Sequence, residues 1–280
     1  MKTKRNYFLL TGAALGFTFL YIPMLMLIVF SFNEARITTS WSRFSLRWYE
    51  SLFANEAIIN ALIISLKIAV ISATIATIIG TMAAIVLVRF KKFKGKTFFS
   101  ALTIAPMVMP EVMTGLAMLI FFVWMEKIFG WPNGRGMTTI ALAHITFCIT
   151  FVAVIVRSRL YSMGEDLEEA AMDLGARPLR VIFDITLPLI APAMMAGWLL
   201  SFTLSLDDVI LATFLSGPGS TTLPLVIFGK VKLGVSPDIN ALGTIIIAVV
   251  TMGIVISGWL MTNKEKAYKR DIQMAIAENK

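Results

Sequence analysis

Three carboxylates lie within or beside long apolar stretches of this 280-residue sequence. Glu111 interrupts an uncharged run over residues 97–125, and Asp207 and Asp208 follow a second run that begins at residue 185. Helices entering near Thr97 and Leu189 would place Glu111 roughly 21 Å and the Asp pair roughly 27 Å into the membrane. Ionisable groups at such depths are costly and are candidates for function. Carboxylates there suit a cationic solute, so these side chains predict a path for cations.

The same residues also have structural interpretations. Asp207 or Asp208 would lie at the outer interface or cap the loop that follows, and Glu111 would satisfy a helix break after Pro110. Lys67, in another apolar run, would snorkel to the interface or pair with one of the acids. The sequence leaves both interpretations open.

A short helix is predicted in the basic-flanked segment 157–190. Ser162 and Glu165 form a capping-box pattern that would start it. Gly175 stands where a left-handed residue commonly ends a helix. Pro178 suits the first turn of the next helix.

One face of this short helix is small and apolar, and the remainder is acidic. The apolar positions, spaced i, i+3, i+4 and i+7, are Leu167, Ala170, Ala171 and Leu174, and the acids are Glu165, Asp166, Glu168, Glu169 and Asp173. Helices that lie on an anionic membrane surface favour Lys and Arg instead. Small alanines let another protein approach closely, so we expect a docking helix for a protein partner.

The elements that position these residues are membrane-spanning helices. The chain is 58% apolar and only 15% charged, with a mean hydropathy of +0.81, and about 20 apolar residues suffice for one span. Six spans are predicted over residues 7–32, 68–88 (with helix entry from about Asn60), 97–125, 136–156, 185–206 and 239–263. A further uncharged run, 209–229, contains Ser216-Gly217-Pro218-Gly219-Ser220 and predicts an extracytoplasmic loop with a short re-entrant helix.

Basic residues set the expected orientation. Segments on one side of the spans hold 17 Lys and Arg, whereas those on the other side hold 7. The positive-inside rule therefore predicts that both termini are cytoplasmic. This asymmetry accounts for the net charge of +8, so no nucleic-acid partner is needed. The outer segment 33–59 is rich in aromatic residues, among them Trp41, Phe44, Trp48 and Tyr49, and would be an interfacial helix, a docking surface for an external partner, or both.

Part of the short cytoplasmic helix matches a known signature. Glu169-Ala170-Ala171-x-x-x-Gly175, followed by Ile185-x-Leu187-Pro188, resembles the EAA loop of type I ABC importer permeases. The resemblance implies that this helix inserts into a cytoplasmic ATPase dimer through Glu169, Ala170, Ala171, Leu174 and Gly175. It also implies a sister permease, an extracytoplasmic binding protein, and a multi-pass location in a bacterial inner membrane. The sequence has no G-x-x-x-x-G-K-[ST] loop, so this chain is expected to be no enzyme and to need no cofactor or metal.

Other stretches resemble the polyamine (spermidine/putrescine) branch of these permeases. They are Ser205–Asp208, Gly217-Pro218, Leu223-Pro224-Leu225 and the run from Gly234 to Leu242, while Trp131-Pro132, Arg135–Met137 and His144–Cys148 are similar to the second permease of putrescine importers. Met109-Pro110-Glu111 departs from the expected pattern by carrying Glu in place of Asp, which keeps the charge and lengthens its reach.

The expected organisation follows from these observations. It comprises residues 1–32 (tip and first span), 33–59 (outer loop), 60–263 (permease domain of five helices, with the coupling loop 157–190) and 264–280 (cytoplasmic tail). Two other functions stay open from the sequence. Intramembrane acids also occur in secondary cation transporters and channels, and a membrane scaffold or receptor without transport would have similar spans.

Overall fold

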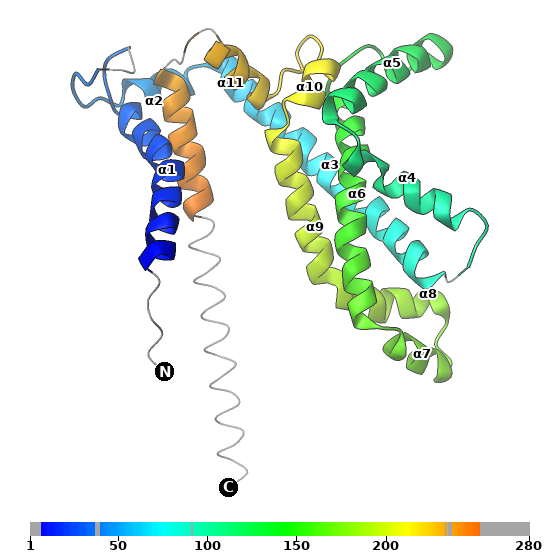
Figure 1. The fold of residues 1–280 in the computed structure, drawn as a ribbon. Coiled ribbons are helices and arrows are strands. Elements are labelled where there is room, and N and C mark those ends of the chain that lie inside the picture. Colours follow the sequence, from blue (N-terminus) through cyan, green and yellow to red (C-terminus); the bar gives the residue numbers. More distant parts are fainter. Residues whose placement is uncertain (1–6, 37–39, 91, 233, 235–236, 253–280) are drawn as a thin grey trace. The chain divides into compact units, whose positions relative to one another are not determined.

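The computed structural model describes residues 7–36, 40–90, 92–232, 234 and 237–252, and these residues are mostly helical (Figure 1). The helices are α1 Tyr7–Ser31, α2 Arg47–Phe53, α3 Glu56–Arg89, α4 Lys96–Val108, α5 Glu111–Phe129, α6 Met137–Met163, α7 Asp166–Asp173, α8 Pro178–Val181, the π-helix η1 Ile182–Thr186, α9 Leu187–Asp207, α10 Ile210–Leu215 and α11 Leu223–Lys232. They form two compact units. One groups the described residues before 57 with those after 229, and the other holds residues 57–229.

Within the described residues, five helical stretches are long and apolar enough to cross a membrane. They are Leu9–Ser31, Glu56–Arg89, Glu111–Phe129, Met137–Met163 and Pro178–Asp207. An all-α, multi-pass membrane fold is therefore confirmed. The sixth predicted span, 239–263, is described only as the helix Pro237–Met252, and its remainder lies outside the described residues. The count of six spans and the cytoplasmic termini remain predictions.

The third predicted span is not one continuous helix. It divides into α4 and α5 at Met109 and Pro110, and Met109 has an extended backbone with a ψ of 138°. Proline disfavours the helical conformation of the residue before it, which ends α4 there. Glu111 is therefore the first residue of α5, and the single continuous helix from which its depth of roughly 21 Å was derived is not present. The helix break at Pro110 is confirmed, whereas the depth of Glu111 and its role in satisfying the break remain predictions.

The uncharged run 209–229 contains the irregular backbone that its glycines predict. The helices α10 and α11 lie within or overlap this run, separated by the turn Ser216–Ser220. The Gly217 amide donates to Ser220 Oγ at 2.8 Å, and that hydroxyl donates to Gly217 O at 2.9 Å. Local hydrogen bonds thus satisfy a polar turn between two short helices.

Small side chains bring the long helices of the larger unit together around α6. A Cβ added at Gly80 of α3 would lie 2.8 Å from Val152 Cβ of α6, and one at Gly197 of α9 would lie 3.4 Å from Val152 Cα. Close helix contact through small residues is typical of membrane proteins. In Figure 1, α6 and α9 run side by side, with α7 and α8 at one end of the pair and α10 at the other.

The smaller unit is organised around α1 and the segment that follows it. A Cβ at Gly243 would lie 3.1 Å from Leu27 Cδ2, so α1 packs against the helix Pro237–Met252. The buried Asn33 accepts from Ser42 N at 2.9 Å through its side chain, and its carbonyl accepts from Trp48 Nε1 at 2.8 Å. The segment that follows α1 is therefore held by hydrogen bonds to the side chain and the main-chain carbonyl of the buried Asn33.

Candidate functional site

The three carboxylates expected in the cation path surround one cavity. This cavity of about 310 Å³ is lined by Glu111, His144, Phe147, Cys148, Leu204, Ser205, Asp207, Asp208, Val209, Ile210 and Leu211. Its walls come from the start of α5, the first half of α6, the end of α9 and the start of α10. The volume lies at the lower end of the range for small-molecule sites. Four elements thus bring Glu111 beside two acids that follow it by almost a hundred residues.

Asp208 connects α9 to α10 and is held by both backbone and side-chain bonds. It caps the C-terminus of α9 in an extended conformation, with a ψ of 127°. Its carboxylate accepts from Ala212 N at 2.9 Å and from Leu211 N at 3.3 Å. The capping role left open by the sequence is therefore confirmed for Asp208, since its oxygens satisfy amides in the first turn of α10.

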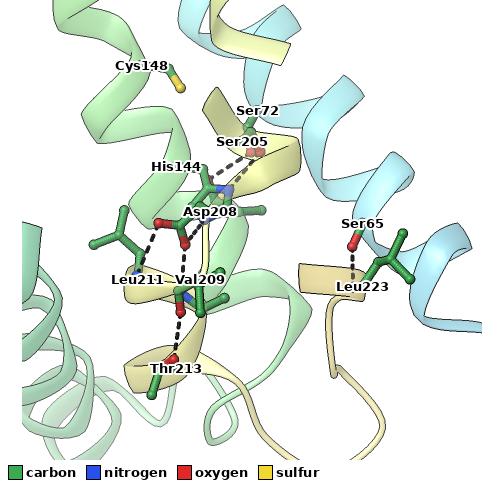
Figure 2. Close-up of polar contacts among 12 residues, drawn as sticks. Ser65, Ser72, His144, Cys148, Ser205, Asp208, Val209, Leu211, Thr213 and Leu223 are labelled. Atoms are coloured by element: carbon green, nitrogen blue, oxygen red, sulfur yellow. Dashed lines mark hydrogen bonds and ion pairs between the residues drawn. The ribbon is translucent and has the colours of Figure 1, made fainter. Parts of the chain in front are cut away.

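His144 is the second partner of Asp208, and the sequence did not predict this role. Its ring is 2% exposed, with Nε2 at 3.2 Å from Asp208 Oδ2 and Nδ1 at 2.6 Å from Ser205 Oγ (Figure 2). An ionised carboxylate only accepts hydrogen bonds, so Nε2–H donates to an ionised Asp208, and in the neutral ring Nδ1 then accepts from the Ser205 hydroxyl. The signal in the sequence was a lone histidine inside an apolar run, which needs a polar partner when buried.

Glu111 and Asp207 have freer surroundings than Asp208. Glu111 is half-buried, Asp207 is exposed, and both side chains line the cavity. Among the described residues, neither forms an ion pair with a basic side chain. Lys67 lies on the exposed face of α3 and is not part of the cavity wall. Two carboxylates are therefore available to a cation in this cavity, and the third is engaged with the protein.

The short helix predicted within residues 157–190 is present as α7, and its end has the expected geometry. Gly175 has a φ of +85°. Its amide donates to Met172 O at 2.9 Å, and the Ala176 amide donates to Ala171 O at 3.0 Å. This pair of bonds is the Schellman motif. Pro178 begins α8, so both predicted boundaries after α7 are confirmed.

The predicted start of α7 is wrong. The preceding helix α6 continues to Met163, and Ser162 Oγ donates to Arg159 O at 2.8 Å within that helix. Glu165 occupies the N-cap position of α7 without a side-chain cap bond. The Ser162 hydroxyl was expected to cap the next helix. Because α6 extends beyond Ser162, this hydroxyl lies within α6 instead. Ser162 and Glu165 therefore form no capping box.

The residues expected to contact an ATPase lie mainly on the outer face of α7. Glu169 and Ala170 are exposed, Ala171 is half-buried, and Leu174 is 91% exposed. Ala171, Leu174 and Gly175 also line an open groove of about 620 Å³ together with Ala176, Arg177 and Arg180. Glu168, expected among the solvated acids, is instead 8% exposed. One acid of this helix thus faces the protein interior while its neighbours face outward.

The outer segment expected to lie at an interface or dock a partner exposes several aromatic and charged groups. Trp41 is 51% and Phe44 is 66% exposed. The Arg43 guanidinium hydrogen-bonds to Glu34 and holds the pKa of that carboxyl below its usual range. An exposed Trp and Phe beside charged side chains suit the headgroup layer or a protein surface equally well.

Comparison with known proteins places these features in a family. Residues 76–270 match the family model described as "Binding-protein-dependent transport system inner membrane component". The chain is 53% identical over 261 residues to the putrescine transport system permease protein PotI of Escherichia coli K12, covering 93% of both chains. It is 39% identical over 257 residues to the spermidine/putrescine transport system permease protein PotC of the same strain, covering 92% of this chain and 95% of PotC.

Solved structures agree on the fold. A chain of a bacterial ABC transporter that imports the acidic polysaccharide alginate superposes with a TM-score of 0.68 at 17% identity, over 94% of this chain and 98% of that one. A chain of the MetNI methionine ABC transporter gives a TM-score of 0.59 at 16% identity, over 73% of this chain and 95% of that one. With the family match covering most of the sequence, the chain belongs to the binding-protein-dependent transport system inner membrane components, the permeases of type I ABC importers.

Proposed function

We propose that this chain is a permease subunit of an ATP-driven polyamine importer in a bacterial inner membrane. The observation that carries the substrate class is the cavity in which Glu111 and Asp207 face the same space. An ammonium group that leaves water needs a fixed negative partner, since an unpaired buried ion costs several kcal/mol. Two carboxylates at separate points of a small cavity suit a short diamine, the substrate class named for PotI and PotC.

In this proposal, the carboxylates of Glu111 and Asp207 replace water molecules that hydrate the ammonium groups in solution. Asp208 stabilises the wall of the same cavity through its bonds to His144 and to the amides of α10. The path needs a second half, which we assign to a sister permease, and a binding protein that delivers the polyamine from outside. The division into an outer loop, 33–59, and a permease domain, 60–263, belongs to the same proposal.

Energy would enter through α7. The exposed Glu169, Ala170 and Leu174, with Ala171 and Gly175 at the groove, form the proposed contact with a dimer of ATPase subunits. The helix α6 links this contact to the cavity, because His144 and Met163 are nineteen residues apart, or roughly 28 Å along one helix. Family membership favours this ATP-driven scheme over a secondary cation transporter.

Competition between matched solutes tests the substrate class. The chain is reconstituted with its ATPase, sister permease and binding protein, and ATP-driven uptake of labelled putrescine is measured. Excess unlabelled diamine should abolish uptake, whereas the diol of the same carbon length should leave it unchanged. Equal competition by the diol would show that charge is not recognised and would overturn the polyamine assignment.

A further inference from the structure

A buried ion pair ties α7 to the end of α3. Arg89 is the last residue of α3, and its Nε lies 2.7 Å from Glu168 Oε2. Its Nη2 donates to Glu168 Oε1 at 3.0 Å and to Gly164 O at 2.9 Å. The two side chains are only 13% and 10% exposed. The guanidinium thus holds both the α7 carboxylate and the linker that leads into α7.

The same carboxylate also reaches the start of α9. Thr186, the last residue of η1, donates from Oγ1 to Glu168 Oε1 at 2.7 Å, and it is 1% exposed. Glu168 therefore joins α7 to α3, which is distant in the sequence, and to the junction of η1 and α9. We call Arg89, Glu168 and Thr186 the α7 clamp.

The surroundings of the α7 clamp strengthen these bonds. Arg89, Glu168 and Thr186 line a cavity of about 260 Å³ whose other walls are mainly apolar, formed by Ile85, Phe90, Met172, Pro178, Val181 and Ile182. Charge-assisted hydrogen bonds are stronger in such surroundings than in water. By contrast, the nearby pair Arg180–Asp184 is 79% and 60% exposed, and exposed pairs contribute little.

The chain segments before and after α7 each contain a glycine, so non-covalent contacts are needed to hold α7 against the long helices. Gly164 precedes α7 with a φ of +74°, and Gly175 follows it with a φ of +85°. Glycine has wide backbone freedom, so the connection at Gly164 permits α7 to pivot relative to α6, and the connection at Gly175 permits it once the two Schellman bonds open. The α7 clamp provides a link to α3 and α9 that passes through neither glycine.

We propose that Arg89, Glu168 and Thr186 are positioning residues that transmit displacement of α7 to α3 and α9. The inference rests on the proposed function, in which an ATPase moves α7. Without the clamp, α7 would follow the ATPase by rotating about its two glycines, and the long helices would stay in place. ATP would then be hydrolysed without transport.

The ratio of polyamine imported to ATP hydrolysed tests this role in the reconstituted complex. Glu168→Gln removes the charge, Thr186→Val removes only the hydroxyl, and Asp184→Asn breaks the exposed pair as a control. The first two variants should hydrolyse ATP but lower the ratio at least about fivefold, the lower end of typical coupling between sites. Asp184→Asn should keep the parent ratio. A parent ratio in Glu168→Gln and Thr186→Val would overturn the inference.

A second variant separates coupling from folding, because a lone Arg89 left buried lowers stability. The double variant Arg89→Met/Glu168→Gln leaves no unpaired charge and should restore the amount of assembled complex. Its transport ratio should stay low if the clamp transmits motion. Recovery of the ratio together with assembly would show that the pair serves folding alone.

The mobility of a spin label on α7 tests the α7 clamp without any measurement of transport. The label is attached at Asp173→Cys, at the exposed end of α7, in a Cys148→Ala background. Its mobility should rise in Glu168→Gln and stay unchanged in Asp184→Asn. Unchanged mobility in Glu168→Gln would overturn the clamp whatever the chain transports. A parent complex that imports no polyamine would instead overturn the proposed function.

Discussion

Asp207 and Asp208 are adjacent in the chain, yet their carboxylates have different surroundings. Adjacent residues near a helix end point in different directions, and here the chain also leaves α9 between them. Asp208 binds His144 and the amides of α10, whereas Asp207 is exposed at the cavity. The sequence predicted that the pair matters, but not which member is bound to other protein groups, because that depends on the end of α9 at Asp207.

Neutral substitutions of the two freer acids should impair import. Glu111→Gln and Asp207→Asn keep size and hydrogen bonding but remove the charge that offsets lost hydration of an ammonium group. We expect each to lower the rate of polyamine uptake about tenfold or more, equivalent to about 1.4 kcal/mol, while ATP hydrolysis continues. Parallel assays of uptake and hydrolysis in reconstituted complexes check this. Uptake at the parent rate in both variants would remove these acids from the path.

Asp208 should instead affect stability. Asp208→Asn and His144→Phe both remove the charge-assisted bond between α6 and the α9–α10 connection, which is worth roughly 1.5–3 kcal/mol. Both variants should unfold at a lower temperature than Asp207→Asn in detergent solution. Thr213→Val serves as the control, since its hydroxyl bonds only to Val209 O on the exposed face of α10. Equal melting temperatures for Asp208→Asn and Thr213→Val would contradict this role.

At the scale of elements, α7 carries both the expected and the unexpected features of the fold. Its C-terminal glycine and the following proline were predictable, because both reflect local backbone rules. The burial of Glu168 was not, since on the sequence it is one of several acids on a short helix. Its tertiary contacts with Arg89, seventy-nine residues earlier, and with Thr186 distinguish it from Glu169.

For the long helices too, some features were predictable from the sequence and others were not. Apolar runs predicted both ends of α1 and α9 to within two residues, because a span is set by hydrophobic length, whereas α3 and α6 extend beyond their runs. The break between α4 and α5 at Pro110 was only an alternative on the sequence, since prolines are tolerated within spans when neighbours satisfy the backbone. The placement of Glu111 at a helix start followed from that break, and with it the geometry of the cavity.

Gly175 should control the position of α7. A Cβ there would meet nothing within 4 Å, so the penalty of substitution comes from its φ of +85° and not from a clash. Gly175→Val should cost about 1 kcal/mol or more and uncouple ATP hydrolysis from uptake. Gly175→Asn is the matched control, since Asn adopts this conformation more readily, and it should retain more coupling. Normal coupling in Gly175→Val would contradict the assignment of α7 as the docking helix.

At the scale of the whole molecule, the orientation in the membrane still rests on charge. The asymmetry of 17 to 7 basic residues predicts cytoplasmic termini. It also predicts that α7 lies on the cytoplasmic side, where an ATPase supplied with cytoplasmic ATP could bind it. The structure shows which residues of the predicted loops are exposed, and these residues permit a direct test of the orientation.

Cysteine labelling should establish this orientation in a Cys148→Ala background. Leu46→Cys and Thr221→Cys replace exposed residues of the predicted outer loops, and Lys94→Cys and Asp166→Cys replace exposed residues of the predicted cytoplasmic loops. An impermeant thiol reagent added to intact cells should label the first two only. All four should react after the membrane is opened. Labelling of positions 94 and 166 in intact cells would reverse the topology.

The energy source of uptake tests the account most directly. Proteoliposomes carry the chain with its ATPase, sister permease and binding protein, and labelled putrescine uptake is followed with ATP alone or with a proton or sodium gradient alone. We expect accumulation with ATP and the binding protein, and none with either gradient. Accumulation driven by a gradient without ATP would contradict it and identify a secondary transporter.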